Sequence, residues 1–180
     1  GESTRNAVFA CFGIVSELLH DLTLMNDDEF VSLVEKRWKG LARLRHLLGD
    51  ETINFQMKGG YEVFMDDNEK SYDVCASKTE YLNKQLEQII GNKVYTLDDE
   101  NKKFGFQHVN HLIRNNYEGQ LDAGLMMEAL IHLAYHHNIK VINGVDITHF
   151  EESDQSVKLY TNHGFNFSAS KVLICTNGFA

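Results

Sequence analysis

The sequence of 180 residues contains no proline and only three cysteines. Average usage of about 5% predicts roughly nine prolines in a chain of this length. Cys11, Cys75 and Cys175 form no Cys-x-x-Cys pair, which argues against a disulfide framework and against a thiolate zinc site. We therefore expect a reducing, cytoplasmic setting.

Basic residues and long apolar runs are also in short supply. Lys and Arg number 17 against 26 Asp and Glu, which gives a net charge of −9. Surplus negative charge repels phosphate backbones and anionic lipid surfaces, so we expect no nucleic-acid partner. The longest strongly apolar stretch, residues 7–15, is far shorter than the ~20 residues that cross a bilayer, and it lacks the features of a signal peptide. We therefore expect no membrane span.

The common catalytic motifs GxSxG, HExxH, GxGxxG and the P-loop are missing. Two histidine pairs raise the question of a metal site: His108 with His111, and His132 with His136, which are spaced to share a helix face. No third ligand is fixed beside either pair, and histidines near the end of a helix gain ordinary dipole stabilisation. We therefore predict no metal site, and a metal-binding interaction module stays an alternative.

The composition, 43% hydrophobic and 24% charged, is that of a globular protein. Apolar periodicity and caps predict helices at residues 14–21, 26–48, 72–90 and 122–137. Strands are predicted at residues 52–55, 61–65, 94–97, 104–106, 139–142, 146–150, 157–161, 165–168 and 171–176. The first two are expected to form a hairpin, and residues 146–168 a three-stranded antiparallel meander. Residues 110–116 give no clear pattern.

The helix at 122–137 is expected to use Leu125, Ala129, Leu130 and Leu133 to pack on a sheet. Strands 140–142 and 171–175 would lie parallel in that sheet, because a continuous apolar run is typical of a strand covered on both faces. Such a strand rarely ends a complete protein. We therefore expect an internal piece of a longer chain.

Three stretches carry a resemblance to a known family. Residues 1–10, GESTRNAVFA, resemble the flavin-contacting loop Ser-x-Arg-Asn-x-Gly-Phe of FAD-dependent oxidoreductases in the D-amino acid oxidase, glycine oxidase and sarcosine oxidase superfamily, with Val8 where glycine is usual. Residues 118–147, the meander and Cys175-Thr176-Asn177-Gly178 are similar to that family's second FAD-domain segment. Residues 47–50 and 59–62 are similar to the start of its substrate-domain insertion.

The resemblance implies an α/β fold: part of an interleaved FAD-binding, Rossmann-like domain with a β-meander, plus part of an α+β substrate domain. Residues 1–25 and 117–180 would belong to the FAD domain, and residues 26–116 to the substrate domain. The GxGxxG segment and the family's C-terminal half are missing from these 180 residues. We therefore expect the isolated chain to hold no FAD and to be inactive. We also expect it either to self-associate through surfaces exposed by truncation or to be poorly soluble.

The resemblance further implies that the parent protein oxidises a small amine or amino acid by hydride transfer to flavin. The residues it places against the FAD are Ser3, Thr4, Arg5, Asn6 and Ala7 at the flavin or its phosphates, Ile147 at the adenine, and Thr176, Asn177 and Gly178 near the adenosine. It assigns no catalytic residue. A flavin-dependent hydroxy-acid oxidoreductase and a non-enzymatic interaction module that uses the histidine pairs stay as alternatives.

Overall fold

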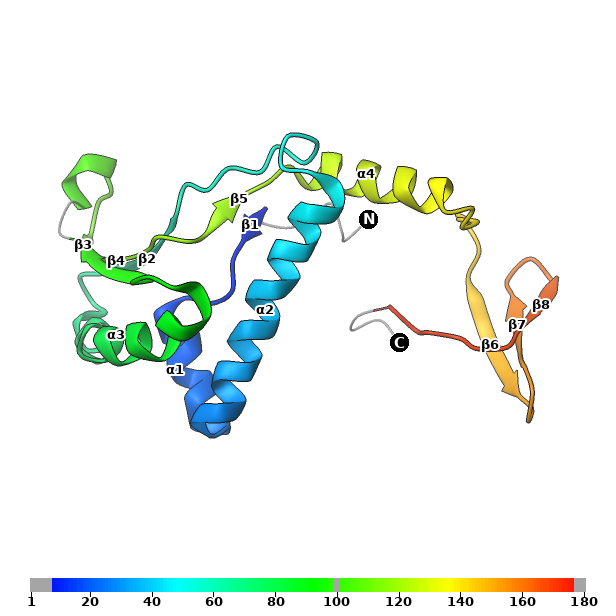
Figure 1. Cartoon of the computed structure of the whole chain (residues 1–180), viewed down its shortest axis with the longest axis horizontal. Helices are drawn as coiled ribbons and strands as arrows, with labels where there is room; N and C mark the ends of the chain where they lie inside the picture. Colours follow the sequence, from blue (N-terminus) through cyan, green and yellow to red (C-terminus); the bar gives the residue numbers. More distant parts are fainter. Residues whose placement is uncertain (1–7, 99–100, 177–180) are drawn as a thin grey trace. The chain divides into compact units, whose positions relative to one another are not determined.

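A computed structural model describes residues 8–98 and 101–176, and packing divides the chain into two compact units, Gly1–Leu133 and Ala134–Ala180 (Figure 1). The helices are α1 (Val15–Leu24), α2 (Asp27–Leu48), α3 (Glu69–Ile90), α4 (Ala123–His136) and the short 3-10 helix η2 (Asn101–Phe104). The strands are β1 (Phe9–Ala10), β2 (Gly60–Met65), β3 (Tyr95–Asp98), β4 (Val109–Asn115), β5 (Gly119–Gln120), β6 (Ile147–Glu152), β7 (Val157–Thr161) and β8 (Asn166–Ala169). No helix among these residues is long and apolar enough to cross a bilayer.

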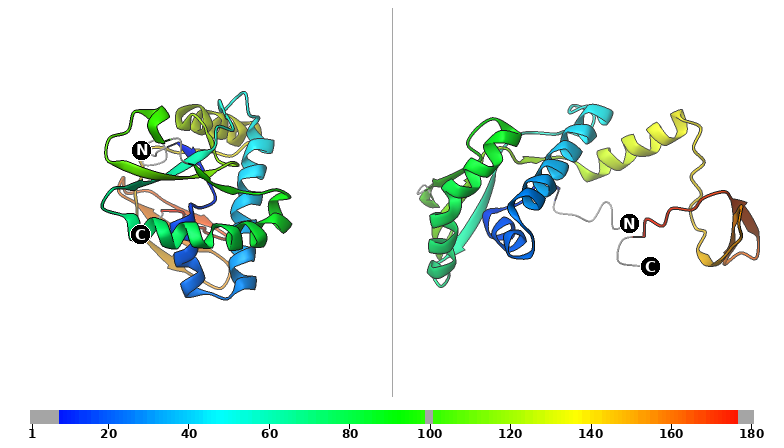
Figure 2. Two further views of the ribbon diagram at one scale, coloured as in Figure 1. Left: turned by 90° about the vertical axis from the view of Figure 1, so that its left-hand side faces the viewer. Right: turned by 60° about the horizontal axis from the view of Figure 1, so that its bottom comes forward.

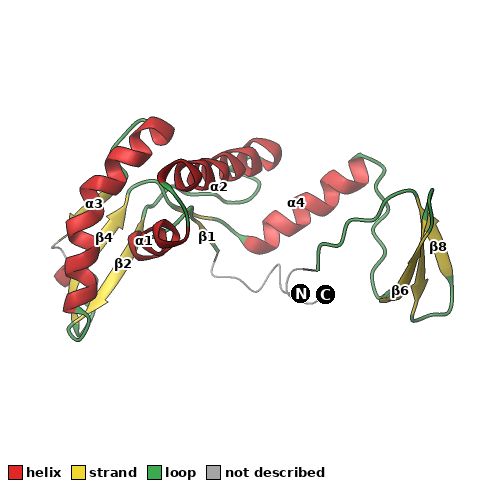
Figure 3. Ribbon diagram, turned by 90° about the horizontal axis from the view of Figure 1, so that it is seen from below, coloured by secondary structure: helices red, strands yellow, loops and turns green. Residues whose placement is uncertain are grey.

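The first unit is built around an antiparallel sheet of order β2-β4-β3. Helix α3 lies along one face of this sheet, and α1 packs against both α3 and α2 (Figures 2 and 3). Apolar side chains from all of these elements form the main core: Phe12, Val15, Leu18, Phe30, Val34, Phe64, Cys75, Leu82, Leu86, Val94, Tyr95 and Ile113. A helical layer over a sheet thus buries one face of each element.

The predicted ends of α2 are confirmed. Asn26 Oδ1 accepts a hydrogen bond from the Glu29 amide (3.0 Å), and Glu29 Oε2 accepts one from the Asn26 amide (3.1 Å). This reciprocal box satisfies two amides that the first helical turn leaves without partners. Gly49 ends the helix at φ +83°, a conformation that glycine adopts without steric cost.

A second, smaller core lies where α4 meets the end of α2. Its buried members are Ala10, Leu48, Ile53 and Phe55, and Leu41, Leu44, Leu121, Met126, Ala129, Leu130 and Leu133 pack against them. Asp122 caps α4, since its Oδ1 accepts a hydrogen bond from the Leu125 amide (3.0 Å). The predicted helix is therefore confirmed, but it packs on α2, Ala10 of β1 and the segment at 53–55 rather than on the predicted parallel sheet, and Leu125 stays exposed.

The second unit contains the antiparallel meander β6-β7-β8, as predicted. Leu159 and Thr161 of β7 are its buried strand residues, whereas every residue of β6 is exposed. The turn after β7 is closed by Thr161, whose hydroxyl donates to the Phe165 carbonyl (2.7 Å). The meander is a single layer.

Two predicted strands are wrong, because residues 139–142 and 171–176 form no ladder with any described strand. Their apolar side chains are largely exposed, and Leu173 reaches 86%. An apolar run becomes a strand only where a neighbouring strand pairs with its backbone groups. The described part of this unit supplies no such neighbour, so the predicted parallel sheet is absent from it.

Three further expectations in the first unit are corrected. Residues 52–55 form a turn, and β2 pairs with the distant β4 instead of closing a hairpin with them. Residues 104–106 end the 3-10 helix and lead into a bend rather than forming a strand. Residues 110–116, which gave no pattern, contain most of β4, the central strand of the sheet.

Candidate functional site

Two of the nine predicted FAD contacts fall within the described residues. Ile147 begins β6, pairs with Thr161 and is 45% exposed. Thr176 is exposed at the end of the segment at 171–176. Both residues are therefore exposed to solvent, and their contact with FAD stays a prediction. Ser3, Thr4, Arg5, Asn6, Ala7, Asn177 and Gly178 lie outside the described residues.

The most unusual polar group in the first unit is Glu118, in the connector between β4 and β5. Its side chain is only 3% exposed, although carboxylates are seldom buried without a partner. The carboxyl lies directly over Gly60, where a Cβ would collide with Glu118 Oε2. A side chain at position 60 would therefore displace this carboxyl from its present position.

Burial raises the pKa of Glu118 to about 7; repulsion from Glu17 and Glu62 adds to the shift, and the side chain of Asn115 opposes it. Burial also raises the pKa of Tyr95 well above its usual value, with Glu118 as the next cause. The Tyr95 hydroxyl donates to the Gly13 carbonyl instead of to a carboxylate. Glu118 and Tyr95 are therefore buried acidic groups, with the exposed Glu17 and the half-buried Glu62 as their acidic neighbours.

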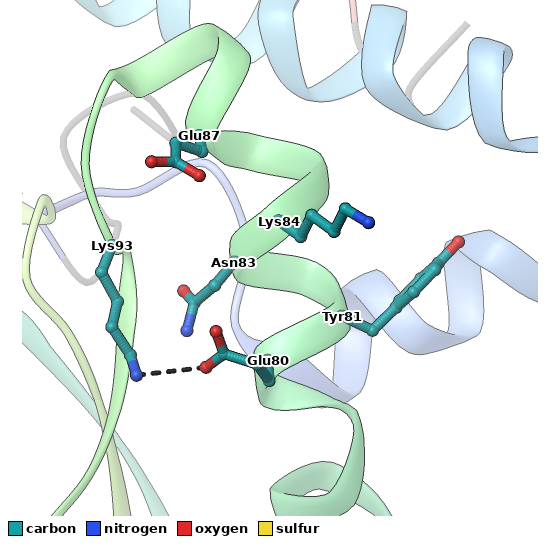
Figure 4. Close-up of a pocket in the computed structure, with 6 residues that line it drawn as sticks. All are labelled: Glu80, Tyr81, Asn83, Lys84, Glu87 and Lys93. Atoms are coloured by element: carbon teal, nitrogen blue, oxygen red, sulfur yellow. Dashed lines mark hydrogen bonds and ion pairs between the residues drawn. The ribbon is translucent and has the colours of Figure 1, made fainter.

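A second buried polar group, Asn83 on α3, holds β3 in place. Its Oδ1 accepts hydrogen bonds from the amides of Val94 (3.0 Å) and Tyr95 (2.7 Å), and its Nδ2 donates to the Tyr95 carbonyl (2.9 Å). Beside it is an open groove where Lys93 Nζ lies 3.1 Å from Glu80 Oε2. The side chains of Tyr81 and Lys84 point away from this ion pair (Figure 4). Because Asn83 uses its polar atoms on the backbone, its role is structural.

The histidine pairs do not converge on a common centre. His108 Nδ1 lies 3.1 Å from Asp66 Oδ2, whereas His111 Nε2 lies 3.0 Å from Glu69 Oε1 and its ring stacks on Tyr72. His132 and His136 are exposed on α4. Among the residues that the structure describes, no three His, Cys, Asp or Glu side chains come close enough together to hold a metal ion.

Sequence reasoning singled out neither buried polar group. Asn83 follows Thr79 and Leu82 along the buried face of α3, so an amide on an apolar helical stripe was the available signal. Glu118 stands next to Gly119 in a short connector, and nothing in the sequence marks it as buried. Its burial depends on Gly60 and α1, which are distant in sequence.

No family model and no curated protein sequence matches the chain. Solved structures that it resembles include the glycine oxidases of Bacillus cereus ATCC 14579 (TM-score 0.57, 15% identity) and Geobacillus kaustophilus (TM-score 0.57, 16% identity). Each match covers 94% of this chain and 44% of the glycine oxidase. An L-proline dehydrogenase from P. horikoshii matches at a TM-score of 0.47, too low to bear on the fold.

The chain therefore has an α/β fold that matches part of the glycine oxidase fold, as its resemblance to that superfamily predicts. It spans less than half the length of the glycine oxidases that it matches. At 15% and 16% identity, the likeness extends to the fold alone.

Proposed function

We propose that this chain is part of an FAD-dependent oxidoreductase that oxidises a small amine or amino acid. The observation that carries the proposal is the match to two glycine oxidases over 94% of the chain. The resemblance of residues 1–10 and 118–178 to flavin-binding segments supports it independently. On this proposal residues 1–25 and 117–180 serve the flavin, and residues 26–116 serve the substrate.

Bound flavin would supply the acceptor for a hydride from the carbon that bears the substrate amine. The chain's own residues bind and orient. Arg5 and its neighbours at 3–7 would hold the flavin or its phosphates, and Ile147 and Thr176 would meet the adenosine half. The three cysteines are free thiols, which supports a reducing cytoplasmic location.

The test is to purify the full-length protein, record flavin absorbance, and assay it with a panel of small amines, amino acids and 2-hydroxy acids. We expect bound flavin and turnover of an amine or amino acid. Turnover of hydroxy acids alone would establish the alternative oxidoreductase. A full-length protein without flavin would overturn the proposal.

A matched pair of variants tests the predicted binding residues. Arg5→Ala should weaken FAD retention at least about tenfold, because a charged hydrogen bond to phosphate contributes about 1.5–3 kcal/mol. Arg43→Ala, on the exposed face of α2, is the control and should leave retention unchanged. Equal retention by both variants would remove Arg5 from the site.

The isolated 180-residue chain should be colourless beside the full-length protein. It has no GxGxxG turn to place the pyrophosphate at a helix N-terminus. At about 1 kcal/mol for an ordinary hydrogen bond, the remaining contacts would not offset the cost of immobilising FAD. A yellow, active 180-residue chain would contradict this expectation.

A further inference from the structure

The connector at residues 116–118 joins the two cores of the first unit. On one side, β4 is the central strand of the sheet that contributes to the main core. On the other, β5 pairs with β1 and bridges to Gln56 beside the smaller core. The Glu118 carbonyl accepts a hydrogen bond from the Gly59 amide (2.8 Å), so the two crossing segments are tied together at this residue.

The Glu118 carboxyl is incompletely satisfied at this crossing. Among the described residues, Glu118 Oε1 is a buried atom without a hydrogen-bond partner, and the neighbouring side chain of Asn115 is the polar group that favours its ionised form. The small pocket beside them, lined by Ile14, Gly60, Glu62 and Tyr95 among others, has no space for a water molecule. An ionised carboxylate there would be buried without hydration, which is strongly unfavourable.

The charges around Glu118 make ionisation still less favourable. Glu17 of α1 and Glu62 of β2 already face the start of α1, where they accept hydrogen bonds from the amides of Ile14 (3.5 Å) and Ser16 (3.3 Å). Burial, followed by Glu118, Glu62 and Glu17, raises the pKa of Tyr95 in β3. Burial, followed by Glu118 and Glu17, raises the pKa of Cys11 before α1. The nearby cation of α2, Arg37, is paired with Asp21 (2.9 Å).

We propose that Glu118 is a pH-sensitive switch: as the neutral acid it keeps the connector packed over Gly60, and its ionisation loosens the link between the two cores. A neutral carboxyl fits because the amides at the start of α1 already bond to the carboxylates of Glu17 and, from β2, Glu62. An ionised one would repel both of them.

The direction of the pH dependence follows from linkage. The pKa of Glu118 rises from the ordinary 4.5 to about 7 in the folded protein. The folded state therefore binds more protons than the unfolded state between these pH values. As pH rises through this window, the equilibrium constant for folding falls by up to about tenfold per pH unit. The contribution of the neutral acid is complete below the ordinary pKa and lost above about pH 7.

Amide hydrogen exchange in the full-length protein tests the switch at about pH 5.5 and about pH 8.5, after correction for intrinsic rates. The reporters are the Gly59 amide, bonded to the Glu118 carbonyl, and the Gln120 amide, bonded to the Gln56 carbonyl (2.9 Å). We expect protection at both to drop at least about tenfold at the higher pH in the wild type. In Glu118→Gln the drop should disappear.

Glu128→Gln, on the exposed side of α4, is the matched control and should behave as the wild type. A drop that persists in Glu118→Gln, or no drop in the wild type, would overturn the proposal. Should Glu118→Gln fail to fold, a carbon-13 NMR titration of the wild-type Glu118 carboxyl replaces it. A titration midpoint of Glu118 near pH 7 supports the switch. A midpoint equal to that of the exposed glutamates refutes it.

Discussion

The two units of the chain contain similar strands but differ in how far they bury the apolar side chains of those strands. In the first unit, α3 covers the sheet, and residues such as Phe12, Leu18 and Phe30 are at most 1% exposed. In the second, Phe150 of β6 and Phe167 of β8 are exposed on a single-layer meander. Aromatic and β-branched residues therefore form strands in both units, but only a second layer turns them into a core.

A pair of phenylalanine substitutions, one in each unit, should show the largest difference in stability between the two units. Phe30→Ala removes a fully buried ring from the main core and should lower the free energy of unfolding of the first unit by about 3–5 kcal/mol. Phe167→Ala removes a ring that is 44% exposed and should cost about 1 kcal/mol or less. Denaturant unfolding, combined with hydrogen exchange resolved by unit, measures both changes.

Equal losses from the two substitutions would contradict the comparison. They would mean that the meander is covered as thoroughly as the main core in the full-length protein. Leu159→Ala is a useful third variant, because Leu159 is a buried residue of β7. It should cost more than Phe167→Ala despite removing fewer atoms.

A pair of asparagine substitutions compares buried hydrogen bonds in the first unit with exposed hydrogen bonds in the second. Asn83→Ala breaks three hydrogen bonds to the buried backbone of Val94 and Tyr95, and should destabilise the first unit by about 2–4 kcal/mol. Asn162 binds Asp146 through two exposed hydrogen bonds in the second unit, where water replaces lost partners. Asn162→Ala should therefore cost about 1 kcal/mol or less, and an equal loss in both would show that burial does not set the difference.

The local parts of the fold could be predicted from the sequence. Asn26 and Gly49 mark the ends of α2, because capping uses atoms within one helical turn. The meander is predicted for the same reason: its turns connect adjacent strands over a few residues. What these elements share is that their partners lie nearby in the chain.

The parts that could not be predicted depend on distant partners. Strand β4 has little apolar alternation of its own and becomes a central strand because β2 and β3 pair with it from both sides. Residues 171–176 have a strand's composition, but no described strand pairs with them. Glu118 is buried because Gly60, about 60 residues earlier, leaves room for its carboxyl. All nine predicted flavin contacts, from Ser3 to Gly178, stay predictions, and most of them lie outside the described residues.

The smallest expected effect comes from polar pairs on the surface, where the two units should not differ. Arg45 holds Asp50 at the end of α2 through two hydrogen bonds (2.8 and 2.7 Å), and in the meander the Tyr160 hydroxyl donates to Glu151 Oε2 (2.7 Å). Both contacts are solvent-accessible, so Asp50→Asn and Glu151→Gln should each cost about 1 kcal/mol or less near neutral pH. Hydrogen bonding from Arg45 lowers the pKa of Asp50, so its contribution is present above the ordinary aspartate pKa and is lost as pH falls through the lowered value. Urea unfolding of Asp50→Asn should therefore converge with the wild type in acid, and high salt should reduce the difference at neutral pH. A loss from Asp50→Asn as large as that from Asn83→Ala would mean that the end of α2 is covered in the full-length protein.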